Sequence, residues 1–141
     1  MNNKIIIMLG ALALIGLCFA PWFTMPKIGN ISLFNILQLA LEAGFKDADS
    51  VADYLFLLFF IYPVMLILTG LKGFEAPRII SIIGGLSVIA FMILTNHQSG
   101  GMANTAFGSW VSMIIYFLIA GASHYFIMQE KKSPAIKPDA Q

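Results

Sequence analysis

The chain has 141 residues, of which 59% are hydrophobic and 11% are charged, and its net charge is +1 at pH 7. Because no basic cluster stands outside the C-terminal tail, the sequence gives no support for binding to nucleic acid. Four long apolar stretches contain no Asp, Glu, Lys or Arg, and polar connections separate them. This pattern predicts an integral membrane protein of the all-α class, in contact with the lipid bilayer.

Each apolar stretch has about the length of a helix that crosses the hydrocarbon core, for which about 20 residues are needed. The expected spans are residues 5–23, 54–71, 79–95 and 107–128. Since backbone amides cannot stay unpaired in lipid, and the alternation of barrel strands is absent, each span should be a helix. The sequence predicts a four-transmembrane-helix bundle in residues 1–128, a single transmembrane domain, and a disordered cytoplasmic tail over residues 129–141.

The first span has two interpretations. Lys4, followed by an apolar run with Cys18 near its end, is also how a secretory or lipoprotein signal begins. Cleavage after Ala20 would leave Pro21 beyond the scissile bond, and Leu17 is bulky where a lipoprotein signal has a small residue. A retained membrane anchor is therefore favoured over a cleaved signal.

The basic residues collect on one side of the predicted spans. That side holds Lys4, Lys72, Arg78, Lys131, Lys132 and Lys137, and the other side holds only Lys27 and Lys46. Because cytoplasmic loops carry an excess of Lys and Arg, both termini and the connection 72–78 are expected in the cytoplasm. Three aromatic residues are expected to be interfacial anchors: Trp22 and Trp110 on the outer side, and Tyr125 on the inner side.

The first outer loop contains an apolar segment that is too short to span. Ser32 can cap its start and Gly44 can end it, which predicts a helix over residues 33–43. Polar residues recur at helical spacing along one side of this helix, so it should be amphipathic and lie along the outer surface. It is either a lid over the helix ends or a docking surface for a partner or lipid. Its interface candidates are Phe34, Leu37 and Gln38.

The second span carries bulky aromatic residues and is expected to face lipid or a partner subunit. Its interface candidates are Phe56, Phe59 and Pro63. Small residues let helices approach closely, so spans one, three and four are expected to make the inner contacts of the bundle. The helix-packing candidates are Gly16, Ala20, Ser81, Gly85 and Gly121.

Residues that could carry chemistry are scarce. With no Asp, Glu, Lys or Arg inside the predicted spans, an ion-coupled carrier is not expected. His97 and His124 fall near opposite ends of their spans and cannot share a metal ion, and Cys18 is the single cysteine. No nucleophile stands in a recognisable catalytic motif. The sequence therefore predicts no catalytic residue, no metal site and no cofactor, with a membrane enzyme as a minor alternative.

Two short motifs flank the predicted spans: Pro21-Trp22-Phe23 leaves the first span, and Gly108-Ser109-Trp110 leads into the fourth. In this layout the chain resembles small bacterial four-span inner-membrane proteins, which implies an inner-membrane location and a topology without an activity. The topology is also similar to that of claudin-type tetraspan proteins. The first loop lacks the cysteine pair and the Trp-Gly-Leu-Trp run of that family, so neither its disulfide-held outer sheet nor paracellular sealing is expected.

Two functions fit these observations. The first is a non-catalytic accessory or scaffold subunit of a membrane protein complex, which contacts another membrane subunit through the outer helix and the second span. The alternative is a small channel or a transporter of lipid or small molecules, which forms its path as a homo-oligomer. Its candidate pore-lining hydroxyls are those of Thr69, Ser81, Ser87 and Ser112, which can instead be satisfied by their own helix backbone.

Overall fold

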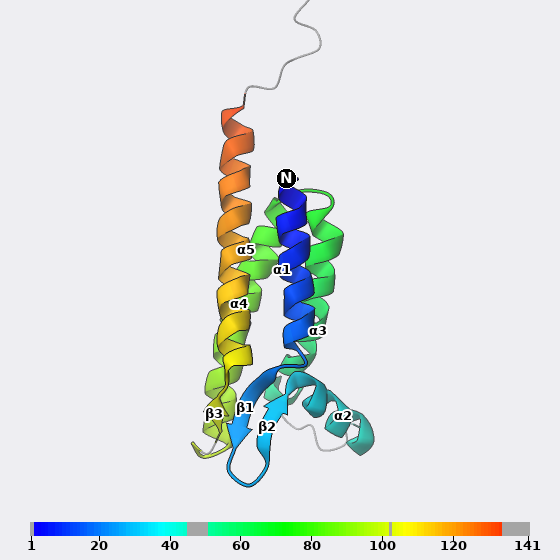
Figure 1. Cartoon of the computed structure of the whole chain (residues 1–141), viewed down its shortest axis with the longest axis vertical. Helices are drawn as coiled ribbons and strands as arrows, with labels where there is room; N and C mark the ends of the chain where they lie inside the picture. Colours follow the sequence, from blue (N-terminus) through cyan, green and yellow to red (C-terminus); the bar gives the residue numbers. More distant parts are fainter. Residues whose placement is uncertain (1, 45–50, 102, 134–141) are drawn as a thin grey trace, which may run out of the picture.

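A computed structural model of the chain describes residues 2–44, 51–101 and 103–133, with the side chains of the second range given from Tyr54 onward. These residues form five helices and three short strands (Figure 1). The helices are α1 (Asn3–Leu17), α2 (Leu33–Ala43), α3 (Val51–Gly70), α4 (Glu75–Gln98) and α5 (Phe107–Lys132), and the strands are β1 (Pro21–Met25), β2 (Gly29–Ser32) and β3 (Asn104–Thr105). The predicted helical class is confirmed, whereas the three strands are not predicted by the sequence.

Two of the described helices, α4 and α5, are long and apolar enough to cross a membrane, rather than the four that the sequence predicts. Helix α1 falls short because it ends at Leu17, after which the chain turns and Pro21 begins β1. The apolar segment Tyr54–Gly70 of α3 is also shorter than the two long helices. The lengths and compositions of α4 and α5 are compatible with a membrane protein.

Four helices lie side by side in a bundle, and the sheet and α2 lie together at one end of it (Figure 1). Helix α4 packs against α5 and α3, and α1 packs against α3 and α5, so each helix has two main neighbours. We call the end that carries the sheet and α2 the outer end, and the end that carries the α3–α4 turn the inner end.

The three interface candidates of α3 lie inside this bundle, so the prediction that they face lipid or a partner is wrong. Phe56, Phe59 and Pro63 are all buried. The ring of Phe59 lies 5.0 Å from that of Trp22 and 5.3 Å from that of Phe91, measured between centroids. Large rings are needed there because they fill the space between α1, α3 and α4 near the outer end.

Glycines allow α4 and α5 to approach closely. A Cβ atom added at Gly84 would lie 2.6 Å from Cε1 of Tyr116, and one added at Gly85 would lie 2.8 Å from Cζ of Phe117. Ser81, one turn before Gly85, is fully buried on α4. Since any larger side chain would push these rings away, the small residues of α4 determine how tightly the two longest helices pack.

Two other packing candidates do not lie at helix contacts. Gly16 on α1 and Gly121 on α5 are exposed, and no side chain or neighbouring backbone lies within 4 Å of an added Cβ atom at either position. Ala20 follows α1 and is partly buried. The four-residue spacing of small residues was misleading here because spacing alone does not reveal which side of a helix meets a neighbour.

A three-stranded antiparallel sheet with the order β2-β1-β3 stands at the outer end. Strands β1 and β2 form a hairpin whose turn uses positive φ angles at Lys27 (74°) and Gly29 (87°). Phe23 of β1 pairs with Ile31 of β2 on one side and with Thr105 of β3 on the other. The sequence predicts no disulfide-held outer sheet. The structure has a sheet at the outer end, and backbone pairing holds its strands together. A disulfide cannot do so within the chain, because Cys18 is the only cysteine.

The outer-loop helix agrees with its prediction, whereas the start of the C-terminal tail does not. Helix α2 has the predicted bounds, residues 33–43. Helix α5 continues to Lys132, so residues 129–132 are helical rather than part of a disordered tail. The rest of the predicted tail, residues 134–141, lies outside the described residues.

Candidate functional site

Local hydrogen bonds define the start and end of α2. The Oγ atom of Ser32 accepts from the backbone N–H of Asn35 (3.1 Å), and the side chain of Asn35 accepts in return from the backbone N–H of Ser32 (3.0 Å). This reciprocal pair is a capping box in which Asn takes the place of the usual Glu or Gln. Gly44 ends the helix in the left-handed conformation with φ 64°. The start and end of the helix are therefore encoded by residues within and beside it.

Two contacts fasten the start of α2 to the end of α1. The backbone N–H of Phe34 donates to the carbonyl of Cys18 (3.1 Å), and the ring of Phe34 lies 5.0 Å from that of Phe19. Leu33, the first residue of α2, is completely buried. Since a hydrogen bond and a buried leucine restrain the first turn, α2 is held at a defined angle to the bundle.

Trp22 lies inside this assembly, where its side chain has almost no free surface, so its predicted role as an interfacial anchor is wrong. Its side chain is 1% exposed, and its indole Nε1 donates to the carbonyl of Leu17 at 2.8 Å. The chain turns after Leu17, which folds the ring back over the end of α1 onto Phe59 and Phe91. Trp22 is thus the centre of the contact between the bundle and the outer sheet.

The other two predicted anchors lie on the surface. Trp110 is 49% exposed, and its indole Nε1 donates to Oγ1 of Thr105 (3.1 Å). Tyr125, near the opposite end of α5, is also exposed, and its hydroxyl accepts from the side-chain amide of Gln129 at 2.7 Å. The two residues lie toward opposite ends of α5, and their anchoring role stays a prediction.

The two motifs that flank the predicted spans meet in space. The carbonyl of Trp22 accepts from Oγ of Ser109 (2.6 Å) and from the backbone N–H of Ala106 (2.8 Å). At Gly108 an added Cβ atom would lie 2.5 Å from the carbonyl oxygen of Pro21. The Pro-Trp-Phe and Gly-Ser-Trp motifs therefore form one structural joint between β1 and α5.

One side of α2 is left uncovered by the described chain. Phe34, Gln38 and Leu41 are exposed, and their spacing places them on the same side of the helix. Phe19 is exposed beside Phe34. We call these four residues the outer α2 face. Leu37, the remaining candidate on this helix, is partly buried and packs against the core.

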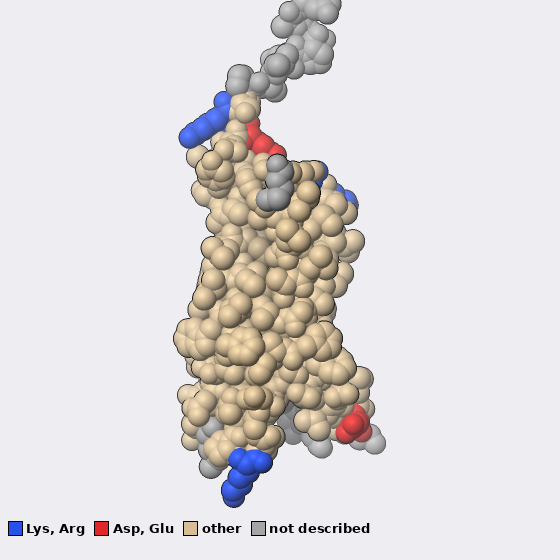
Figure 2. Space-filling view, viewed as in Figure 1, with Lys and Arg blue, Asp and Glu red and all other residues tan. Residues whose placement is uncertain are grey.

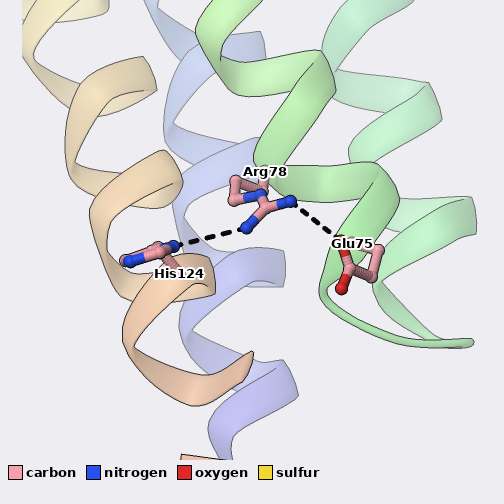
Figure 3. Close-up of polar contacts among 3 residues, drawn as sticks. All are labelled: Glu75, Arg78 and His124. Carbon is pink, nitrogen blue, oxygen red and sulfur yellow. Dashed lines mark hydrogen bonds and ion pairs between the residues drawn. The ribbon is translucent and has the colours of Figure 1, made fainter. Parts of the chain in front are cut away.

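The inner end of the bundle holds a chain of three polar side chains (Figure 3). Arg78 of α4 donates to Oε2 of Glu75 at 2.9 Å in an exposed ion pair, and its other terminal nitrogen lies 3.3 Å from Nδ1 of His124 on α5. Because a guanidinium group can only donate, Nδ1 of His124 is the acceptor. This arrangement bonds α4 to α5, which is a structural role for His124.

The four hydroxyl residues that the sequence offers as pore-lining candidates are bonded or buried within the bundle of a single chain. Ser87 is hydrogen-bonded to the hydroxyl of Tyr62 (3.1 Å), and Thr69 donates to the carbonyl of Met65 (2.6 Å). Ser81 and Ser112 are buried on α4 and α5. Ser81, Ser87 and Ser112 therefore lie where helices pack against one another rather than on an outer surface. Thr69 is bonded to its own helix.

No group of three or more His, Cys, Asp and Glu residues that could hold a metal ion occurs in the described part of the chain. Hollows do occur at both ends of the bundle. The outer one has a volume of about 380 Å³ and is lined by Met92, Asn96, Asn104 and Trp110, among others. The inner one is larger, about 540 Å³, and has charged residues around it.

Comparison with known proteins gives no family assignment. No protein-family model, curated protein or solved structure matches the chain. Its function must therefore be argued from the geometry of its own residues.

Proposed function

We propose that this chain is a four-span membrane protein that acts as a non-catalytic accessory or scaffold subunit of a membrane complex. Four spans are supported by the position of α1 and α3 beside the two long helices (Figure 1). At 1.5 Å per residue, the 20 residues of α3 extend about 30 Å, and the 15 residues of α1 extend about 22 Å. The residues after α1 can cover the remaining depth, because Phe19, Trp22 and Phe23 are apolar.

The distribution of charge supports this placement. Figure 2 shows a broad uncharged belt between two ends that carry the Lys, Arg, Asp and Glu side chains. Among the described residues, Lys4, Lys72, Arg78, Lys131 and Lys132 belong to the inner end, and Lys27 belongs to the outer end. The excess of basic residues favours the cytoplasm for the inner end and for both termini. The bacterial inner membrane is the location that the resemblance of the sequence implies.

The outer α2 face is the surface that we expect a partner protein to cover. It presents two exposed aromatic rings and Leu41 on a helix whose start is restrained by the capping box and by the bond from Phe34 to Cys18. A restrained helix loses little conformational freedom when a partner covers it. The partner is another membrane subunit, because apolar side chains and Gln38 at the rim of the bundle suit a mixed apolar and polar contact. Phe56 and Phe59 of α3 take no part, since they are buried.

The test is native mass spectrometry of the chain extracted in native lipid particles at endogenous expression. A reproducible foreign subunit is expected, and the double variant Phe34→Ala/Leu41→Ala should lose it. The matched control is Leu39→Ala, which removes an equally exposed leucine from a different side of the same helix. A chain that carries only lipid, or equal losses in both variants, would overturn the proposal.

The alternative of an oligomeric channel or of a transporter for lipid or small molecules has one observation in its favour. Ser81, Ser112 and Ser123 are buried on α4 and α5, and their hydroxyls have no hydrogen-bond partner among the described residues. Buried hydroxyls without partners attract water, and a row of waters between α4 and α5 would be the start of a polar path. This alternative predicts a homo-oligomer and solute flux in liposomes, which Ser81→Ala/Ser112→Ala would reduce.

A further inference from the structure

The larger hollow lies at the inner end, where α3 passes into α4 and where α5 ends. Its volume is about 540 Å³, and its walls include Lys72 and Glu75 from the α3–α4 turn and the start of α4, and Glu130 and Lys131 from α5. These positions follow from the lengths of the helices, because α5 continues past Ile127 and brings its last turn beside the turn between α3 and α4.

Two buried apolar side chains contribute to this cavity. Phe74 and Ile127 are each less than a tenth exposed, and the ring of Phe74 lies 5.1 Å from that of Phe126. Leu71 and Met128, which adjoin the cavity residues Lys72 and Ile127 in the sequence, are exposed apolar residues. The cavity thus has apolar as well as charged walls, as an amphiphilic ligand requires.

Two lysines and two glutamates line the cavity, but one of the glutamates is already engaged by a residue outside it. Glu75 is paired with Arg78 at 2.9 Å, which leaves Glu130 as the acid beside Lys72 and Lys131. A further cation lies close by, because Nζ of Lys4 donates to the carbonyl of Leu71 at 2.7 Å, one residue from Lys72. The cavity therefore favours a ligand with a net negative charge.

We infer that this cavity binds the headgroup of an anionic glycerophospholipid, with the phosphodiester between Lys72 and Lys131. The inference rests on the proposed membrane placement, which puts the cavity at the level of the cytoplasmic headgroups. A free phosphate compound would satisfy the lysines but would leave the apolar surface of Phe74 and Ile127 unused. A phospholipid uses both, because its glycerol and first methylenes can lie against that surface.

The experiment is native mass spectrometry of the full chain in detergent, titrated with phosphatidylglycerol or with phosphatidylcholine of the same acyl chains. The wild-type chain should retain phosphatidylglycerol in preference, and Lys72→Gln/Lys131→Gln should bind it about tenfold more weakly. The control is Lys132→Gln, which removes the adjacent charge that does not line the cavity. The variant Lys72→Arg/Lys131→Arg keeps both charges and should keep the binding.

Three results would overturn the inference: equal retention of the two lipids, equal losses in the double Gln variant and in Lys132→Gln, or binding of soluble glycerol phosphate as strong as that of the lipid. The last would identify a free phosphate compound as the ligand. The measurement does not involve α2 or a protein partner. A loss of lipid selectivity therefore leaves the accessory-subunit proposal untouched, because that proposal is tested by whether a foreign subunit stays bound to the chain.

Discussion

The guanidinium group of Arg78 lies 3.3 Å from Nδ1 of His124 and joins the inner ends of α4 and α5 across 46 positions of sequence. Since the guanidinium only donates, Nδ1 of the imidazole is the acceptor in this contact. A cation at position 124 would instead face the charge of Arg78. The contact is therefore stabilising only while residue 124 can accept a hydrogen bond.

The first prediction concerns this contact. His124→Lys should lower thermal stability by up to about 1 kcal/mol, since the side chains are exposed and solvent screens the repulsion. His124→Gln should be close to wild type, because its side-chain oxygen can accept from Arg78. Thermal unfolding in detergent at low salt measures both, and added salt should narrow the difference. A His124→Gln protein as unstable as His124→Lys would show that the hydrogen bond is not the cause.

The second prediction separates the two tryptophans, which are the only ones in the chain. Trp110→Phe leaves Trp22 as the sole indole, and Trp22→Phe leaves Trp110. Acrylamide should quench the fluorescence of Trp22 weakly because its side chain is 1% exposed, and that of Trp110 more strongly because its side chain is 49% exposed. The measurement needs only the purified protein in detergent. Equal quenching of the two single-tryptophan proteins would contradict the buried position of Trp22.

The third prediction tests the close approach of α4 and α5. Gly84→Ala should destabilise the bundle by about 1–3 kcal/mol, because its Cβ atom would overlap the buried ring of Tyr116. Gly121→Ala should be neutral or stabilising by up to about 1 kcal/mol, since alanine favours the helix and nothing obstructs it. Unfolding midpoints of the two variants provide the comparison. Similar midpoints would mean that the helices are not in contact at Gly84.

The fourth prediction concerns the cap of α2. Ser32→Ala removes the acceptor of the Asn35 N–H and should weaken α2 by about 1 kcal/mol. Hydrogen exchange followed by mass spectrometry should show faster exchange in peptides from α2 and little change in α4 and α5. Gln38→Ala, an exposed change within the same helix, serves as the control. Uniformly faster exchange throughout the protein would indicate global destabilisation in place of a local cap.

Features encoded by neighbouring residues could be predicted from the sequence. The bounds of α2 follow from Ser32 and Gly44, whose capping and left-handed conformations are local properties. The helical class follows from long apolar stretches, and the charged ends follow from the positions of the basic residues. The predicted length of the first span is too great, because apolar residues after Leu17 continue the stretch without continuing the helix.

The candidate site needed information that no local pattern contains. Apolarity predicts that Trp22 avoids water, but it does not distinguish lipid from a protein core, and the structure buries the ring against Phe59 and Phe91. The same ambiguity misplaced the aromatic residues of α3. In membrane proteins both environments are apolar, so composition cannot decide between them.

What the sequence by itself determined is therefore the set of helical segments, the cap of α2 and the two charged ends. Only the tertiary structure decided that β3 pairs with β1, that the carbonyl of Trp22 accepts from Ser109, and that Lys72 and Lys131 line one cavity. The physical reason is separation along the chain. Capping and hydrophobic patterning act over a few residues, whereas these contacts join residues that are 59 or more positions apart and depend on how the helices pack.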